Sequence, residues 1–139
     1  MRRPPDLASL RAAWWAHRAL NAARSALAVG AIREIELAPP PRLPASAIRG
    51  VEGLLRRRQH TCIERALVRQ RWLAAHGDPR AIAIGVTSPS SGFIAHAWLV
   101  GEGDPQAPAF HELTRLEPAF DGPSRLKPAF DSPSRLERK

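Results

Sequence analysis

Hydrophobic residues recur at helical intervals along the first third of the chain, with polar residues between them. The apolar residues that recur at these intervals within residues 6–37 include Leu7, Leu10, Trp14, Leu20 and Leu27. Apolar residues that recur every three or four positions predict an amphipathic helix, so this segment is one long helix or two shorter ones. The proline-rich stretch "APPPRLPA" at 38–45 ends it, because proline lacks a backbone N–H and disfavours helical backbone in the preceding residue.

A second helix is predicted directly after these prolines. Ser46 can cap its start, and Ile48, Val51 and Leu55 then lie on one side. The three arginines at 56–58 fall near its end, where positive charge is favourable beside the helix dipole.

The third helix begins with a capping motif. In "TCIE" a threonine is followed three residues later by a glutamate, the pattern in which each side chain accepts a hydrogen bond from the other residue's backbone N–H. Thr61 is therefore the predicted cap and Cys62 the first helical residue. Gly77 is the predicted stop, since glycine adopts the left-handed conformation that ends helices.

Alternation replaces the helical period after this third helix. In "AIAIGV" (81–86) and "FIAHAWLV" (93–100) the larger residues occupy every second position, which is typical of strands. "TSPSSG" between them has the composition of a turn, and "AFHEL" (109–113) is a candidate third strand. The predicted fold class is α+β, with N-terminal helices followed by a small antiparallel sheet in meander order.

Composition indicates a folded domain outside the membrane. Of the 139 residues 44% are hydrophobic and 24% charged, which is ordinary for one globular domain. A single cysteine excludes an internal disulfide. The most apolar run, at 19–32, is too short for a membrane span and contains Asn21 and Arg24, and the first residues lack a signal-peptide pattern. We therefore expect a cytoplasmic protein with no membrane partner.

The formal net charge is +8, and arginine supplies almost all of the positive charge. Such a surface is either a solvated basic face or one that attracts nucleic acid or an acidic peptide. The arginines are spread over several predicted elements, with neither a helix-turn-helix glycine pattern nor an aromatic stacking strand. We therefore do not expect nucleic acid to be the partner, although a basic nucleic-acid-binding module remains an alternative.

The end of the chain repeats itself. "RLEPAFDGPS" (115–124) is followed by "RLKPAFDSPS" (125–134), a period of ten residues that differs at two positions. A unit of ten residues with two prolines cannot form a solenoid repeat. We expect a duplicated, flexible tail at 119–139.

A thiol, an imidazole and a carboxylate occur in an order that suits acyl chemistry. Cys62 is at a predicted helix N-terminus, where the helix dipole favours the thiolate. His96 lies within the second strand and Glu112 on the third. Nucleophilic catalysis by a thiol needs an imidazole to move protons and an acceptor to hold that imidazole in one tautomer. Each residue also has a structural interpretation, so the hypothesis depends on their combination.

The same region resembles a known family. The ordered set "TCIERALVRQRWLAAHGDPRAIAIGV" and "FIAHAWLV" is similar to the transglutaminase-like cysteine proteases that remove the leader from lasso-peptide precursors, over about residues 50–118. The resemblance implies that Cys62 is the nucleophile and His96 the general base. The loop "GEGDPQAP" is longer than the family pattern, so Glu112 is the best match for the third member and Asp104 is the alternative.

The resemblance also implies a transglutaminase- or papain-like core that places the nucleophile at a helix N-terminus. It implies one domain over residues 1–118, divided into N-terminal helices (6–58) and a catalytic core (59–118). No cofactor is expected, and no metal either, because the cysteine and the histidines do not fall at zinc-ligand spacings. An acyltransferase acting on another substrate is the alternative within the same fold.

The implied reaction is hydrolysis of one peptide bond in a ribosomally made precursor, upstream of a separate ATP-dependent cyclase. A domain of this size has no room for a leader-recognition module, so the expected partners are the precursor's leader peptide, a separate leader-binding protein and the cyclase. Trp14 and Trp15 are candidate anchors for the leader-binding protein, since adjacent tryptophans on a helix cannot both face one apolar stripe.

Overall fold

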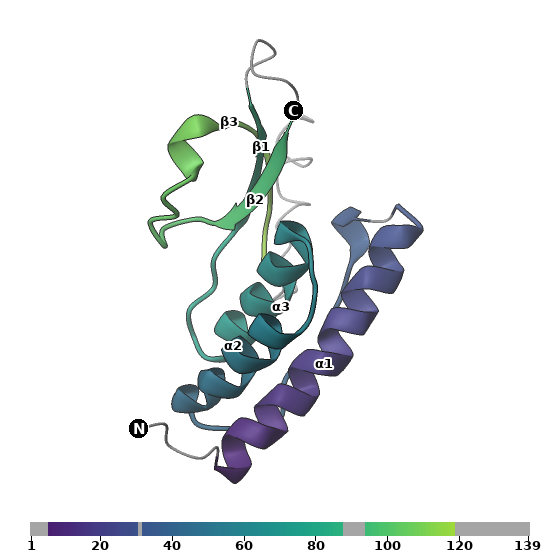
Figure 1. Cartoon of the computed structure of the whole chain (residues 1–139), viewed down its shortest axis with the longest axis vertical. Coiled ribbons are helices and arrows are strands. Elements are labelled where there is room, and N and C mark those ends of the chain that lie inside the picture. Colours follow the sequence, from purple (N-terminus) through teal and green to yellow (C-terminus); the bar gives the residue numbers. More distant parts are fainter. Residues whose placement is uncertain (1–5, 31, 88–93, 119–139) are drawn as a thin grey trace, which may run out of the picture.

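Three α-helices precede a three-stranded antiparallel sheet in the part of the chain that the computed structural model describes, residues 6–30, 32–87 and 94–118 (Figure 1). The elements are α1 (Leu7–Ala28), the short 3-10 turns η1 (Ile32–Glu34) and η2 (Ala45–Ala47), α2 (Ile48–Arg57), α3 (Cys62–Ala75), β1 (Ile82–Val86), β2 (Ala95–Leu99), the 3-10 turn η4 (Ala107–Ala109) and β3 (His111–Leu116). This order confirms the predicted α+β class. The predicted tail at 119–139 lies outside the described residues.

The hydrophobic core lies between the helices and continues under the sheet. Its largest fully buried side chains are Leu20, Val51, Val68, Trp72 and Ile82. They come from α1, α2, α3 and β1, so every helix contributes to a single cluster. No helix among the described residues has both the length and the hydropathy needed to cross a bilayer.

The two adjacent tryptophans of α1 face different surroundings, as the sequence predicts. Trp15 is buried, and its indole N–H donates to the Ala38 carbonyl at 3.1 Å. Trp14 remains 62% exposed and stacks on His17. Trp15 is therefore a core residue that ties the proline-rich segment to α1, and only Trp14 is accessible from solvent.

The start of α2 differs from the prediction. Ser46 lies inside the turn η2, and α2 has Ala47 at its N-cap with no side-chain cap. The backbone replaces the cap, because the Ala47 N–H donates to the Pro44 carbonyl at 2.9 Å and Ala47 already has helical dihedral angles. The predicted Ser46 cap is therefore wrong.

The start of α3 is the predicted capping box. The Thr61 hydroxyl accepts from the Glu64 N–H at 3.2 Å, and the Glu64 carboxylate accepts from the Thr61 N–H at 3.0 Å. Arg24 of α1 also donates to both carboxylate oxygens of Glu64, at 3.1 and 3.2 Å. Cys62 is thus the first residue of a helix whose N-terminus is tied to α1. Gly77, with φ of +83°, follows the end of the helix.

The strand order is β2-β1-β3, and not the sequential order of a meander. β1 pairs with both neighbours in antiparallel fashion, and its Gly85 faces His96 on β2 and Glu112 on β3. The meander prediction is wrong because the free edge of β2 is taken up by the N-terminus of α3, as described below. The loop after β2 consequently carries the chain across to the other edge of β1.

Candidate active site

Cys62 lies against the outer edge of β2. Its Sγ accepts a hydrogen bond from the Ala97 N–H at 3.3 Å. The Val100 N–H donates toward β1, to the Ala81 carbonyl, so the alternation of a strand directs the Ala97 N–H away from the sheet. The thiol therefore occupies a hydrogen-bonding position at this edge that a further strand would otherwise take.

A pocket of about 290 Å³ opens beside the thiol. Its lining comes from α3, β2 and the loop that follows β2, and consists of Cys62, Arg65, Ala66, Arg69, His96, Ala97, Trp98, Leu99, Glu102, Gly103, Asp104 and Pro105. The sequence-predicted nucleophile and base thus line one pocket, although the hydrogen bond of Cys62 within the described residues is to the Ala97 N–H and not to the imidazole.

The imidazole of His96 contacts a carboxylate through one ring nitrogen and packs against two aromatic side chains. Its Nε2 lies 3.0 Å from Oδ2 of Asp104. Its ring stacks on Trp98 at 5.6 Å between centroids and packs against Phe110 at 5.0 Å. Since a carboxylate can only accept, Nε2 carries the proton in the neutral ring and Nδ1 presents a lone pair. Nδ1 is the nitrogen that remains for the thiol.

Gly85 allows Phe110 to reach this imidazole. A Cβ at Gly85 would lie 2.7 Å from the carbonyl oxygen of His111 and 3.2 Å from Cβ of Phe110. The β1–β3 register also shifts between Ile84 and Gly85. A side chain at residue 85 would push away the segment that carries Phe110, which packs against the imidazole.

Asp104 is ionised at neutral pH. Burial raises the pKa of its carboxyl, but hydrogen bonds from the Gln106 N–H, at 2.7 Å, and from His96 outweigh burial, and its pKa lies below the ordinary value. The side chains of His96 and Asp104 are 15% and 23% exposed, so the pair is shielded from bulk water without being sealed off. A fixed carboxylate at this position holds the imidazole tautomer.

Glu112 is placed elsewhere. It lies on β3, separated from β2 by the central strand, and its carboxylate pairs with Arg115 three residues away. That exposed ion pair lowers the pKa of Glu112. The contact with His96 that the sequence predicts for Glu112 is made instead by Asp104, the alternative. Glu112 is the best match to the family pattern only because the loop "GEGDPQAP" lengthens the spacing after His96.

Comparison with known families identifies the superfamily of the chain. A family model described as the transglutaminase-like superfamily matches residues 5–119. The chain belongs to the transglutaminase-like superfamily. Neither the curated proteins nor the solved structures gave a match. Membership in this superfamily suggests a cysteine-dependent enzyme, and Cys62 is the chain's one cysteine.

Two charged residues of this transglutaminase-like site were missed by sequence reasoning. Arg69 and Glu102 line the pocket and form an ion pair there. Arg69 follows Cys62 by seven residues, close to two helical turns, so helical periodicity puts both residues on one face of α3. That spacing was the available signal. Glu102 sits in an irregular loop and offered none.

Proposed function

We propose that this transglutaminase-like protein is a cysteine peptidase in which Cys62, His96 and Asp104 act as nucleophile, general base and orienting carboxylate. One observation carries the proposal: the thiol at the start of α3 shares a pocket with an imidazole whose Nε2 is held by a carboxylate. This is the set of groups that thiol acyl chemistry needs.

The groups support a balanced reaction. Nδ1 of His96 takes the thiol proton, and Sγ of Cys62 attacks the peptide carbonyl carbon to give a tetrahedral oxyanion. The Cys62 backbone N–H, which has no partner within the helix because it belongs to the first turn, is a donor to that oxyanion. The C–N bond then breaks, and the imidazolium gives its proton to the departing amine. Water, deprotonated by Nδ1, hydrolyses the thioester and restores the thiol.

Acyl transfer to an amine is the second candidate, because the superfamily match and the thioester intermediate are compatible with both outcomes. The acceptor that reaches the thioester decides between them. Adding a primary amine to a reaction and weighing the products separates the two: a peptidase gives the free acid, and a transferase gives the amide.

For the substrate, we propose the leader junction of a lasso-peptide precursor, whose released core a separate cyclase would consume. Support comes from the sequence resemblance of residues 50–118 to that class of leader peptidases. The test is incubation of the full chain with a lasso-peptide precursor, followed by mass spectrometry. One cut that is absent in Cys62→Ala supports the proposal, and an intact precursor with and without a leader-binding protein contradicts it.

For the leader-binding protein, we propose a docking site on α1. A groove of about 600 Å³ runs between α1 and the proline-rich segment, and Leu10, Arg11, Trp14, Arg18 and Pro39 are among its lining residues. Exposed Trp14 is its aromatic anchor, whereas Trp15 is buried and is not available. The flanking arginines fit an acidic partner surface.

Trp14→Ala tests this docking site. Cleavage by the unmodified chain should be at least about tenfold faster with the leader-binding protein than without it, through a raised effective concentration of the scissile bond. Trp14→Ala should lose most of that acceleration and keep the unassisted rate. Leu113→Ala, which removes a comparably exposed apolar side chain on β3, is the matched control. Full acceleration of Trp14→Ala would exclude this groove.

A further inference from the structure

We propose that Arg69 is a positioning residue of this site, which fixes the loop that carries Asp104 against the helix that begins with Cys62. The inference rests on the proposed thiol chemistry. It assigns a role in that chemistry to a residue that touches neither of the reacting groups.

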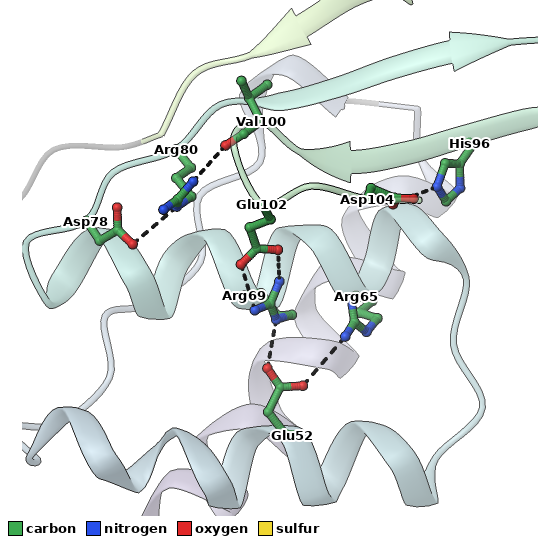
Figure 2. A network of polar contacts seen from close by, with 9 residues as sticks. All are labelled: Glu52, Arg65, Arg69, Asp78, Arg80, His96, Val100, Glu102 and Asp104. Carbon is green, nitrogen blue, oxygen red and sulfur yellow. Dashed lines mark hydrogen bonds and ion pairs between the residues drawn. The ribbon is translucent and has the colours of Figure 1, made fainter. Parts of the chain in front are cut away.

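Arg69 uses all three of its guanidinium nitrogens to join α2 to this loop. Nη1 and Nη2 donate to the two carboxylate oxygens of Glu102, at 2.6 and 2.9 Å, and Nε donates to Glu52 of α2 at 2.8 Å (Figure 2). Its side chain is only 12% exposed. A paired, bidentate guanidinium in such surroundings has one preferred orientation, so the loop cannot shift without breaking both bonds to Glu102.

Because Glu102 and Asp104 are close in sequence, fixing Glu102 also restricts the position of the Asp104 carboxylate. Only Gly103 separates Glu102 from Asp104, whose carboxylate reaches His96 (Figure 2). The start of the same loop is held separately, because Arg80 donates to the Val100 carbonyl at 3.0 Å. The loop is thus anchored on both sides of the turn that precedes Asp104.

The helix α3 therefore carries both the nucleophile Cys62 and the arginine that fixes the loop of Asp104. Cys62 and Arg69 lie about two turns apart on the face of α3 that lines the pocket. A helix of this length is rigid, so the position of Asp104 relative to the thiol is set by α3 through Arg69 and Glu102. Lysine would keep the charge at residue 69 but could not make the bidentate contact, since its ammonium is a point donor.

The test uses hydrolysis of p-nitrophenyl acetate, a small activated ester that reports acylation of Cys62 without needing the natural substrate. Arg69→Lys and Glu102→Gln should each lower kcat by about tenfold and leave KM within about twofold, because binding of a small ester does not depend on the loop. Arg71→Lys is the matched control: Arg71 is a buried arginine of α3 that donates to the Leu37 carbonyl, outside this pocket. Its kcat should stay within about twofold of the unmodified chain.

A double-variant measurement separates positioning from general destabilisation. If Arg69 acts through Asp104, Arg69→Lys should lower kcat by less than about twofold in an Asp104→Asn background, because the group it positions is already lost. Circular dichroism establishes that each variant is folded at the assay temperature, and Glu102→Gln carries the test if Arg69→Lys does not fold.

Three results would overturn the inference. The first is an unchanged kcat in Arg69→Lys and Glu102→Gln, and the second is a full tenfold loss of kcat when Arg69→Lys is introduced into the Asp104→Asn background. The third is a loss of kcat in Arg71→Lys as large as that in Arg69→Lys. These failures are distinct from failure of the proposed function. If hydrolysis persists in Cys62→Ala, the thiol chemistry itself is wrong and the positioning role falls with it. If hydrolysis needs Cys62 and Asp104 but not Arg69, only the positioning role falls.

Discussion

Three residues from three different local structures line the pocket at the thiol. Cys62 follows the capping box of α3, His96 lies on β2, and Asp104 lies in the loop after β2 and contacts His96. Short sequence patterns predict the capping box and the strand alternation, so Cys62 could be placed at a helix start and His96 within a strand from the sequence. The loop residue depends on the path of the chain across the sheet, which no local pattern records.

Exchanging the carboxylates one at a time distinguishes their roles. Asp104→Asn should lower kcat by about tenfold or more, because an amide at this position no longer holds the imidazole with a full charge and can present the wrong hydrogen-bonding group. Glu112→Gln removes a charge of the same kind from an exposed ion pair and should leave kcat within about twofold. Steady-state kinetics on both variants provide the comparison. A larger loss in Glu112→Gln would restore Glu112 as the third member.

The capping glutamate gives the fold a defined pH dependence. Hydrogen bonds from Arg24, against the opposing effect of burial, lower the pKa of Glu64 in the folded state. Stabilisation by its carboxylate is therefore full above about pH 4.5, the ordinary value, and is lost as the pH falls through the lower folded-state pKa. Glu64→Gln should reduce the free energy of unfolding at pH 7 by about 1 kcal/mol. Urea unfolding should show this difference shrinking toward zero as the pH falls from 5 to 2, and a difference that grows would contradict it.

At the scale of elements, the helices and strands follow from the sequence better than their pairing does. The apolar periods predicted α1, α2 and α3 and the strands β1 and β2. The predicted end of the first helical segment at the prolines of 38–45 is wrong, because α1 already ends at Ala28, just before Gly30 with its φ of +79°. β3 starts two residues later than the predicted strand and extends further. The order of the strands was not predictable, because it depends on whether the outer edge of β2 is free to pair with β3. Cys62 covers the outer edge of β2, and that contact is long-range in sequence.

The crossing of α1 and α2 depends on a glycine. A Cβ at Gly50 would lie 1.9 Å from the backbone oxygen of Ser9, a contact that only a shift of one helix could relieve. Gly50→Ala should therefore lower the free energy of unfolding by about 3 kcal/mol. Gly53→Ala, one turn further along α2, is the matched control, because its Cβ would meet nothing closer than the Arg56 guanidinium at 3.8 Å. It should raise stability by about 0.5–1 kcal/mol through helix propensity. Denaturant titrations measure both, and equal effects would contradict the close crossing.

At the scale of the whole molecule, the helices lie at one end and the sheet at the other, with α3 extending from one to the other (Figure 1). The pocket of the thiol lies where α3 meets the edge of β2, and the groove of Trp14 lies on α1. The proposed reaction and the proposed docking of a partner therefore use separate surfaces. The net charge of +8 acts over the whole molecule and would steer acidic peptides toward both.

The repeated tail should be dispensable. The match to the superfamily ends at residue 119, before the second copy of the repeat begins. Deleting residues 125–139 should leave the melting temperature and the rate of ester hydrolysis unchanged. A deletion that begins at residue 115 is the contrasting control, because it removes the end of β3 with the buried Leu116 and should destabilise the fold. A marked fall in melting temperature with the shorter deletion would show that the second copy packs on the domain.

The most direct test of the central claim is the rate at which iodoacetamide alkylates Cys62 at pH 6, followed by intact-protein mass spectrometry. An isolated thiol is almost entirely protonated at this pH and reacts slowly. If His96 and the start of α3 maintain a thiolate, the unmodified chain should react at least about tenfold faster than His96→Ala, and that advantage should vanish in urea. Equal rates for the unmodified chain, His96→Ala and the unfolded chain would mean that Cys62 is an ordinary thiol and that the site is not catalytic.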